Sequence, residues 1–398
     1  MTERLHLADS LLLAFDARVV GHGVWSGRPS VVLDRSVFYP ESGGQMADRG
    51  VLGGSAVIDV QVDDAGAVHH VIEGELPTVG SEVRGEVDRA RRRLFMALHT
   101  GQHLLSRALV DVARAQTVSS RLGETDCTVD VDKEALPDAK VAAAEDLVNA
   151  IIDEDVRVRA FFPSADELAS LPLRRPPKVT ENIRVVQIGD FDVSACGGTH
   201  CATSAQVGLV HVTGSERYKG KLRLFFSAGA RARSELAVEA GLLHALARTM
   251  TCGPAAVPAA VESLRRDLGD ARDSLKRASE KIAVALAVEL AREADLRGES
   301  RIVACLDEGG ADAIRALARE LTNAGDRVAI LGARGADGVA LVVARGPESA
   351  FDCAALVKRL TAAAGGRGGG RPERAEGRLP AEADLGSLVR ADGATLRA

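Results

Sequence analysis

The sequence predicts an α+β protein built from four consecutive parts. Short β-prone runs separated by glycine- and aspartate-rich turns fill the first 90 residues, and mixed helix and strand patterns follow to about residue 235. A helical stretch and a second region of strands and helices complete the chain. The 398 residues are enough for two or three domains, and a hydrophobic fraction of 46% can fill their cores.

The composition limits the class of protein. The formal net charge of −6 gives the whole chain no attraction for nucleic acid, so any nucleic-acid surface must be local. The six cysteines do not follow the pattern of a small disulfide-bonded secreted domain, and no apolar stretch reaches membrane length. We therefore expect a cytoplasmic protein that does not associate with membranes.

The first part, residues 1–90, is expected to form a small β-barrel, because its strand candidates recur with the rhythm of all-β domains. Residues 43–45, Gly-Gly-Gln, fall between two such strands. Spacing alone favours an ordinary hairpin turn there, although glycines also permit close approach to a ligand. His69 and His70 point to opposite faces of a strand, so we interpret both as solvated hairpin residues.

The second part, residues 91–235, reads as an α+β layer structure. Apolar residues recur at helical spacing around positions 94–109, and residues 139–153 form a second amphipathic pattern. Strands are expected at 156–162, 184–188 and 222–226.

The remaining chain separates into a helical and an α/β part. Between residues 236 and 299, leucines and an isoleucine recur at three-, four- or seven-residue steps, which predicts an antiparallel helical hairpin or coiled coil. From residue 300 to 398, buried strands alternate with helices. A glycine-rich stretch follows at 365–372, either a flexible linker or a loop whose amides and guanidinium groups suit phosphate.

Two short motifs predict a metal site. His99 and His103 are four residues apart, so a helix would place both imidazoles on one face. Cys196 and His200 have the same spacing around a Gly-Gly turn. Either motif alone is more often a surface or core feature, but together they supply the nitrogen and sulfur donors of tetrahedral zinc. The adjacent Cys201 could be a fifth ligand, but we interpret it as a residue that packs against the ligands or supports them from behind.

Three motifs also carry a resemblance to a known family. Residues 38–45 (FYPESGGQ), 98–105 (LHTGQHLL) and 188–191 (IGDF) running into 196–200 (CGGTH) resemble, in family order, the editing domain of alanyl-tRNA synthetase and the free-standing AlaX editing proteins. The α/β part with its glycine-rich stretch resembles the DHHA1 domain, which contacts tRNA in alanyl-tRNA synthetases and long AlaX proteins. The resemblance implies a barrel domain (1–90), a zinc-binding editing domain (91–235), a helical linker (236–299) and a DHHA1-like domain (300–398).

The resemblance further implies an ATP-independent hydrolase that clears Ser-tRNA(Ala), and in some members Gly-tRNA(Ala), while sparing Ala-tRNA(Ala). It implies one zinc ion per chain and tRNA(Ala) as partner, and homologous architecture favours a homodimer. Because the chain begins almost at once with the barrel, we expect editing in trans without aminoacylation. The implied site residues are Gln45, Thr100 and Gln102 as catalytic, Ser42, Gly43, Gly44, Gly369 and Arg371 as substrate-binding, and His99, His103, Cys196 and His200 as metal ligands.

Several alternatives stay open at this stage. Zinc can activate water or orient the substrate; we favour orientation, with one labile ligand. Thr100 follows His99 where a zinc peptidase would have its glutamate, so a peptidase is disfavoured. The absence of an Asp-His-His triplet disfavours a phosphoesterase, whereas a non-catalytic, zinc-containing tRNA-binding protein remains the alternative. Glu376 beside the glycine-rich stretch would repel phosphate.

Overall fold

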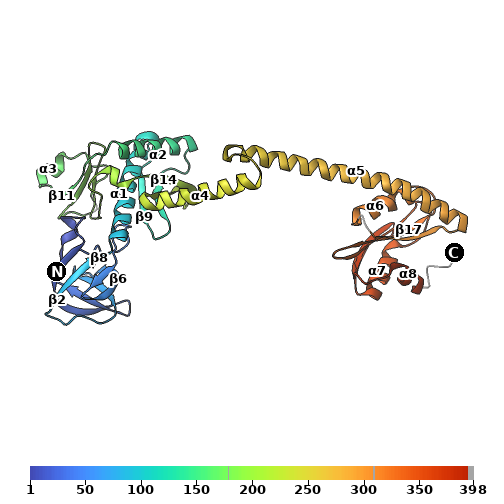
Figure 1. The fold of residues 1–398 in the computed structure, drawn as a ribbon, viewed down its shortest axis with the longest axis horizontal. Helices are drawn as coiled ribbons and strands as arrows, with labels where there is room; N and C mark the ends of the chain where they lie inside the picture. Colours follow the sequence, from blue (N-terminus) through green and yellow to red (C-terminus); the bar gives the residue numbers. More distant parts are fainter. Residues whose placement is uncertain (178, 308–309, 393–398) are drawn as a thin grey trace. The chain divides into compact units, whose positions relative to one another are not determined.

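The computed structural model describes residues 1–177, 179–307 and 310–392, which form two compact units, Met1–Ala245 and Leu246–Ala398 (Figure 1). The final six residues of the predicted 300–398 part lie outside the described residues. The finer division of the chain into four parts stays a prediction.

Six antiparallel strands of the first unit close into a barrel, in the order β2-β3-β7-β6-β5-β8. Alternating side chains such as Leu33 and Val60 fill its interior. The interpretation of His70 as solvated is wrong, because its side chain is fully buried. The strands are β2 (Ala14–Trp25), β3 (Arg28–Leu33), β5 (Gly50–Leu52), β6 (Ser55–Val62), β7 (Val68–Glu73) and β8 (Glu82–Val87), with the short parallel pair β1 (Glu3–Arg4) and β4 (Arg35–Ser36) beside helix η1 (Leu5–Leu7).

Helix α1 (Arg89–Ala113) leads from the barrel into the second core of this unit. Asp88 caps its first turn by accepting hydrogen bonds from two backbone amides, which explains why the helix begins there. The predicted helix at 139–153 is α2 (Asp138–Asp153). The other elements are a four-stranded sheet of β14 (Val210–Tyr218), β15 (Lys221–Ala228), β10 (Cys127–Val131) and β9 (Thr117–Leu122), a three-stranded sheet of β11 (Val158–Phe161), β12 (Val185–Ile188) and β13 (Asp192–Ala195), and the helices α3 (Ala165–Ser170) and η2 (Ser204–Val207).

A buried ion pair joins α1 to the barrel. The Arg92 guanidinium contacts the Asp48 carboxylate, with Nε 3.0 Å from Oδ2, and both side chains are about 1% exposed. Arg92 also donates to the carbonyl oxygens of Ser10, Leu12 and Val37. Because every polar group of the pair has a partner, the barrel and α1 are held in one arrangement.

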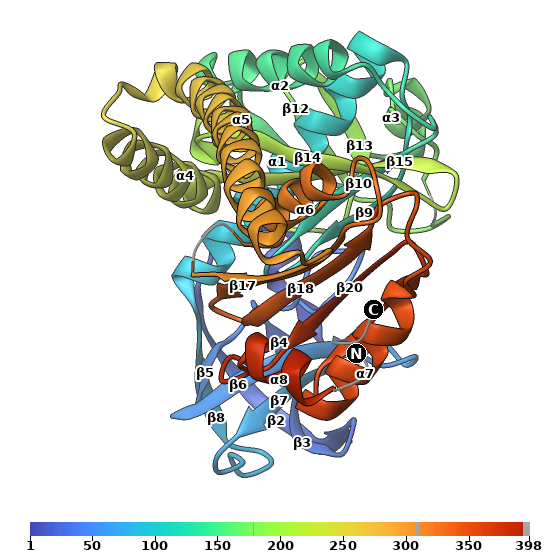
Figure 2. The same ribbon diagram turned by 90° about the vertical axis from the view of Figure 1, so that its right-hand side faces the viewer.

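Helices cover both faces of the five-stranded sheet in the second unit (Figure 2). Ala329 and Leu331 face the long α5 and α6, whereas Val328 and Ile330 face α7 and α8, as alternation along a strand requires. The elements are α5 (Val257–Arg297), α6 (Gly310–Leu321), α7 (Cys353–Ala364), α8 (Leu385–Ala391), and the strands β16 (Arg301–Leu306), β17 (Val328–Gly335), β18 (Gly338–Arg345), β20 (Arg374–Leu379) and β19 (Arg367–Arg371).

Helix α4 (Gly229–Thr249) and the short η3 (Pro254–Ala256) precede α5, with the boundary between the units within α4. Two helices therefore occupy the region of the predicted hairpin, and their pairing stays a prediction. Within the described residues, every helix is too short or too polar to cross a lipid bilayer.

The prediction of a linker or loop at 365–372 is wrong. Gly365 ends α7 with a positive φ of 72°, and Arg367–Arg371 is the edge strand β19, paired antiparallel with β20. The three successive glycines hid this strand from the sequence pattern, because glycine disfavours strands unless backbone or side chains approach closely. A Cβ on Gly368 would lie 2.6 Å from a Val357 methyl group of α7.

Candidate metal centre

Four donor side chains converge inside the first unit. His99 and His103 lie one turn apart on α1, and Cys196 and His200 follow strand β13 on the turn that leaves it. Their ligand atoms all lie within 4.8 Å of one another. The three histidines are at most 5% exposed, whereas Cys196 is partly exposed and marks the accessible side of the cluster.

The geometry of this cluster fits a tetrahedral zinc ion. Bonds of about 2.3 Å to sulfur and 2.0–2.1 Å to nitrogen would place neighbouring donor atoms about 3.3–3.6 Å apart. The Cys196 Sγ lies 3.4 Å from Nε2 of both His99 and His200. Three imidazoles and one thiol are a donor set that suits zinc. The residues present therefore match the predicted ligands and could hold the ion.

Each histidine is held by a different partner at its outer nitrogen. His99 Nδ1 lies 2.7 Å from the Gln45 side-chain oxygen, and His200 Nδ1 lies 3.2 Å from the Thr100 hydroxyl. His103 Nδ1 lies 3.2 Å from an oxygen of the Asp192 carboxylate. These contacts turn the Nε2 atoms inward, because a hydrogen bond at one ring nitrogen fixes the orientation of the other.

Asp192 is part of a buried polar chain. Arg174 donates from Nε to Asp192 Oδ1 at 2.7 Å and from Nη2 to the Ser194 hydroxyl at 3.1 Å. Ser194 in turn donates to Asp192 Oδ2 at 3.0 Å. Burial opposes ionisation of Asp192, but His103 and Arg174 outweigh it and lower the pKa of the carboxyl. Asp192 thus stays charged behind His103, one of the four donors.

The donors also shift one another's pKa values. Burial raises the pKa of the Cys196 thiol, but the surrounding histidines outweigh it and hold that pKa well below its ordinary value. Burial lowers the pKa of His200 to about 3, with His99 adding to the effect. These shifts favour a Cys196 thiolate and a neutral His200. Burial opposes a charged His103, but Asp192 and Cys196 outweigh it and raise its pKa to about 9, so a metal ion would have to displace that proton.

Two glycine-containing turns shape the surroundings of the cluster. Gly43 and Gly44 have φ values of 58° and 90°, and Ser42 and Gln45 exchange backbone hydrogen bonds across them. This is a type I′ hairpin turn, which needs two residues with positive φ. At Gly198, a Cβ would lie 2.1 Å from the His99 ring. Buried Arg184 donates to the carbonyl oxygens of Cys196 and Gly198 and fixes the second turn.

The other predicted residues of the first unit lie at different depths. Ser42, Gly43 and Gly44 are exposed, whereas Gln45 and Thr100 are fully buried. Gln45 also donates from Nε2 to the Thr199 hydroxyl at 2.9 Å. Gln102 donates to the Ser106 hydroxyl at 2.7 Å, away from the four donors.

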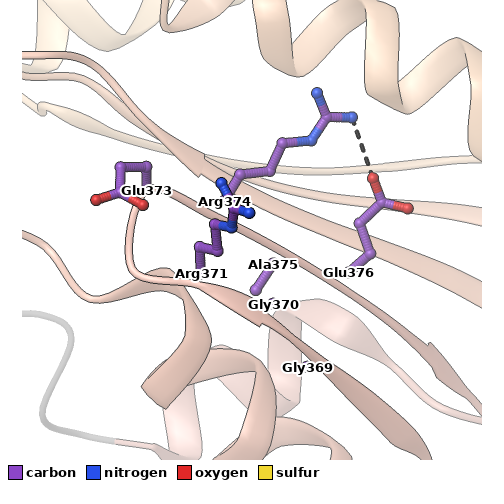
Figure 3. A pocket seen from close by; sticks show the side chains of 7 residues that line it. All are labelled: Gly369, Gly370, Arg371, Glu373, Arg374, Ala375 and Glu376. Atoms are coloured by element: carbon purple, nitrogen blue, oxygen red, sulfur yellow. Dashed lines mark hydrogen bonds and ion pairs between the residues drawn. The ribbon is translucent and has the colours of Figure 1, made fainter.

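Gly369 and Arg371 line a separate cavity in the second unit, beside the hairpin of β19 and β20 (Figure 3). Glu376 lies beside them and pairs with Arg374 at 3.1 Å. It also pairs with Arg315 of α6 at 2.7 Å. The acid that was expected to repel phosphate therefore has two cationic partners.

Three outer residues of the metal centre were missed in the sequence: Asp192, Arg174 and Arg184. Asp192 and Ser194 share one face of β13, and a carboxylate within a short apolar strand was a detectable signal. Arg174 and Arg184 lie in irregular segments, where periodicity carries no information.

Comparisons with known proteins match three segments of the chain. The family model described as "tRNA synthetases class II (A)" matches residues 17–91, "Threonyl and Alanyl tRNA synthetase second additional domain" matches 183–225, and "DHHA1 domain" matches 298–395. Among solved structures, the C-Ala domain of Aquifex aeolicus alanyl-tRNA synthetase matches 24% of this chain and 89% of its own at 20% identity, with a TM-score of 0.23 that is too low to bear on the fold.

Curated relatives cover the chain more fully. Alanine–tRNA ligase of Pyrococcus abyssi is 31% identical over 394 residues, which are 95% of this chain and 42% of the ligase. Alanyl-tRNA editing protein AlaX-L of Pyrococcus horikoshii is 34% identical over 244 residues, 59% of this chain and 60% of AlaX-L. The chain thus spans about two fifths of the ligase's length. Its editing-type segments and its DHHA1 segment therefore make the chain similar both to AlaX-L and to the corresponding part of alanine–tRNA ligase.

Proposed function

We propose that this protein hydrolyses the ester bond of mischarged tRNA(Ala), chiefly Ser-tRNA(Ala) and also Gly-tRNA(Ala), without aminoacylating tRNA itself. One observation carries the proposal: the four donors of a zinc site converge beside a Gly-Gly-Gln turn, in a chain similar to an alanyl-tRNA editing protein. The hydrolysis consumes water and releases free amino acid and tRNA, so it needs no ATP.

His99, His103, Cys196 and His200 would hold the ion. A bound zinc ion would supply a positive charge that orients the amino and hydroxyl groups of the substrate, or acidifies a water. Gln45, Thr100 and Asp192 keep the imidazoles in position from behind, which fits a site that must be rigid before substrate arrives. Ser42, Gly43 and Gly44 present exposed polar backbone beside this cluster.

Selectivity for serine over alanine requires a group that hydrogen-bonds the serine hydroxyl. A site built for such a bond rejects a substrate that lacks the hydroxyl, because its polar group then stays unpaired. Ser42 is the candidate with an exposed side chain, whereas Gln45 and Thr100 are engaged by histidines. We therefore propose that Gln45 and Thr100 position the histidines, and we assign no role in the reaction to Gln102.

We further propose that Gly369 and Arg371 contact the tRNA backbone. Edge strand β19 carries exposed arginines at both ends, and the three glycines between them have no side chains of their own to cover its backbone. Guanidinium groups and free amides both bind phosphate oxygens. Because Arg315 and Arg374 compensate Glu376, repulsion from that acid is reduced.

The direct test incubates purified protein with Ser-tRNA(Ala) and Ala-tRNA(Ala), with and without a zinc chelator. We expect rapid release of serine, little release of alanine, and loss of activity on chelation. Cys196→Ala should lose both zinc and activity, and Asp190→Asn, an exposed change on the preceding turn, should retain both. Serine release no faster than in buffer would exclude the hydrolase.

The alternative, a non-catalytic protein that keeps zinc for structure, is favoured by one feature. Four protein ligands are typical of closed structural zinc sites, whereas catalytic sites usually keep an open position. Under this alternative, the protein would bind tRNA(Ala) and contain zinc but leave Ser-tRNA(Ala) intact. The same incubation, with a tRNA-binding measurement, therefore separates the two.

A further inference from the structure

A cavity in the first unit lies beside the residue that follows His200. It has a volume of about 230 Å³ and lies between the N-terminal segment, the first turns of α1 and the residues that follow His200. Its lining residues are Ser10, Leu11, Leu13, Arg89, Arg92, Arg93, Met96, Cys201 and Gln206. We call this cavity the arginine pocket.

The charge of the arginine pocket is entirely positive. Arg89 and Arg93 are exposed, lie four residues apart on α1 and so share one face of the helix. Neither has an ion-pair partner among the residues that the structure describes, and the lining contains no carboxylate. Two uncompensated guanidinium groups at one cavity create a site for an anion, and their geometry suits phosphate.

The N-terminal segment that lines the pocket is held by hydrogen bonds. Arg92, held by Asp48, donates to the carbonyl oxygens of Ser10 and Leu12. The Ser10 hydroxyl accepts the backbone N–H of His200 at 3.4 Å, so the same segment touches a metal ligand. Binding in the pocket therefore needs little rearrangement of the N-terminal segment.

The rest of the lining is apolar. Leu11 is 52% exposed, and Leu13 and Met96 extend the same wall. A ligand that uses the whole pocket must combine an anion with a flat or apolar part. The volume is below the 300–1,000 Å³ typical of small-molecule sites, so a fragment of a larger substrate fits better than a complete cofactor.

The arginine pocket is close enough to the metal centre to share a substrate with it. Arg93 precedes His99 by six residues of one helix, a rise of about 9 Å. Met96 and Thr100 are one turn apart, and the Thr100 hydroxyl contacts His200. A nucleotide strand that ends at the metal centre could therefore reach the arginines.

We infer that the arginine pocket binds a backbone phosphate and the adjoining base near the 3′ end of the RNA whose terminal ester lies at the metal centre. This inference rests on the proposed function for the identity of the RNA. Arg89 and Arg93 contact the phosphate, and Leu11 and Met96 pack against the base. The pocket thereby contributes to substrate affinity and positions the 3′ end relative to the four donor side chains.

The experiment compares the full-length protein with the variant Arg89→Gln/Arg93→Gln. The probe is an uncharged RNA minihelix that contains the acceptor stem and a single-stranded 3′ CCA. The matched control is Arg18→Gln/Arg28→Gln, which removes two exposed barrel arginines that likewise have no ion-pair partner among the described residues. We expect about tenfold weaker binding for the pocket variant and a slope of log K against log salt that is shallower by about 1–2. The control should bind like the natural protein.

A second variant tests the base. Leu11→Ser should weaken binding of the CCA-ended minihelix but not of a blunt minihelix without the single-stranded end. Equal binding by the pocket variant and the control would overturn the inference, as would competition by AMP or pyrophosphate at the same concentrations as the minihelix. The minihelix carries no amino acid, so its binding does not depend on deacylation. A chain that binds it through these arginines but does not deacylate Ser-tRNA(Ala) would refute the proposed hydrolase and leave the phosphate site standing.

Discussion

At the scale of single residues, the metal centre depends on which nitrogen of each imidazole points inward. An amide oxygen, a hydroxyl and a carboxylate occupy the outer nitrogens of His99, His200 and His103. Asp192 is the charged one of the three, and Arg174 compensates its charge from the other side. The charge makes Asp192 the strongest acceptor among these partners.

Replacing Asp192 by asparagine should weaken zinc binding by about 10–100-fold, the usual effect of removing such an outer partner. The amide can still accept a hydrogen bond from His103, but it carries no charge and leaves Arg174 without its ion-pair partner. Competition with a chromogenic chelator would measure the affinity.

Asp190→Asn is the matched control, because Asp190 is exposed two residues away. Its zinc affinity should equal that of the natural chain. Circular dichroism would check that Asp192→Asn remains folded. Unchanged affinity in a folded Asp192→Asn protein would contradict the positioning role.

His70 shows a different use of a buried imidazole. Its Nδ1 donates to the Val31 carbonyl oxygen at 3.0 Å, and its Nε2 accepts from the Ser36 hydroxyl at 2.7 Å. Ser36 in turn accepts the backbone N–H of Phe38. These bonds are satisfied by the neutral ring, and burial lowers the pKa of His70 from 6.5 to about 4.

The lowered pKa predicts acid sensitivity of the first unit. The unfolded chain takes up the His70 proton near pH 6.5, and the folded chain only near pH 4, so stability is complete above 6.5 and falls between these values. The loss is about 2 kcal/mol at pH 5, at 1.36 kcal/mol per pH unit. Urea unfolding at pH 7 and pH 5 would measure it.

His70→Gln should reduce the stability of this unit at pH 7 but flatten its decline towards pH 5. His244→Gln, which changes an exposed imidazole on α4, should keep the decline of the natural chain. Equal slopes for His70→Gln and the natural chain would assign the acid sensitivity to other groups.

The convergence of the four donor residues was predictable from sequence, and the residues that support them were not. The four-residue spacings of His99–His103 and Cys196–His200 are local, so a helix and a turn suffice to place the donors. The partners of these ligands come from elsewhere in the chain, as with Gln45 behind His99. A pairing across 54 residues leaves no periodic trace in the sequence.

At the scale of elements, one part of α5 packs against the second unit, whereas another part exposes large apolar side chains to solvent. Its C-terminal half packs Ala283 and Ala287 against the sheet of the second unit. Leu268, Leu275 and Ile282 follow one another at seven-residue steps and are 51%, 69% and 66% exposed. Alanines at 271, 278 and 285 each follow one of these residues by three positions and so lie on the same stripe. Large and small residues in alternation suit close packing against a second helix.

We propose that a second copy of α5 covers this stripe, which would make the protein a dimer. Leu275→Glu should shift the natural chain towards monomer in sedimentation equilibrium, because a buried glutamate would lack a partner. Lys276→Glu is the control. It changes the net charge more than Leu275→Glu does, at the adjacent exposed position, but it lies off the stripe. A natural chain that sediments as a monomer at high concentration would refute the proposal.

The heptad steps of α5 were visible in the sequence, whereas strand β19 was not. Its five residues are Arg-Gly-Gly-Gly-Arg, a composition that local propensity assigns to loops. Pairing with β20 and the close approach of α7 override that propensity. Such an override comes from tertiary contacts, so no reading of the five residues alone could reveal it.

At the scale of the whole molecule, the two compact units have separate cores, and the candidate metal centre belongs to the first unit alone. The barrel core and the core around α1 both belong to Met1–Ala245, where the buried Arg92–Asp48 pair joins them. The four donor side chains that could hold a metal ion lie in this unit as well. Composition changes along the sequence located the helical and α/β regions, but they could not show that barrel and editing-type segments share one unit.

Zinc should therefore stabilise one unit and not the other. A ligand that binds only the folded state adds RT ln(1 + [L]/Kd), about 2.7 kcal/mol at one hundred times Kd. For a unit of this size, that corresponds to a rise in melting temperature of about 5–10 °C. Calorimetry should show two transitions, of which a chelator lowers only the melting temperature of Met1–Ala245.

In Cys196→Ala, the melting temperature of this transition should already be low without the chelator and should no longer respond to it. A single transition, or two that move together on chelation, would mean that the units unfold as one cooperative body, because metal binding in one unit can stabilise the other only through contacts between them.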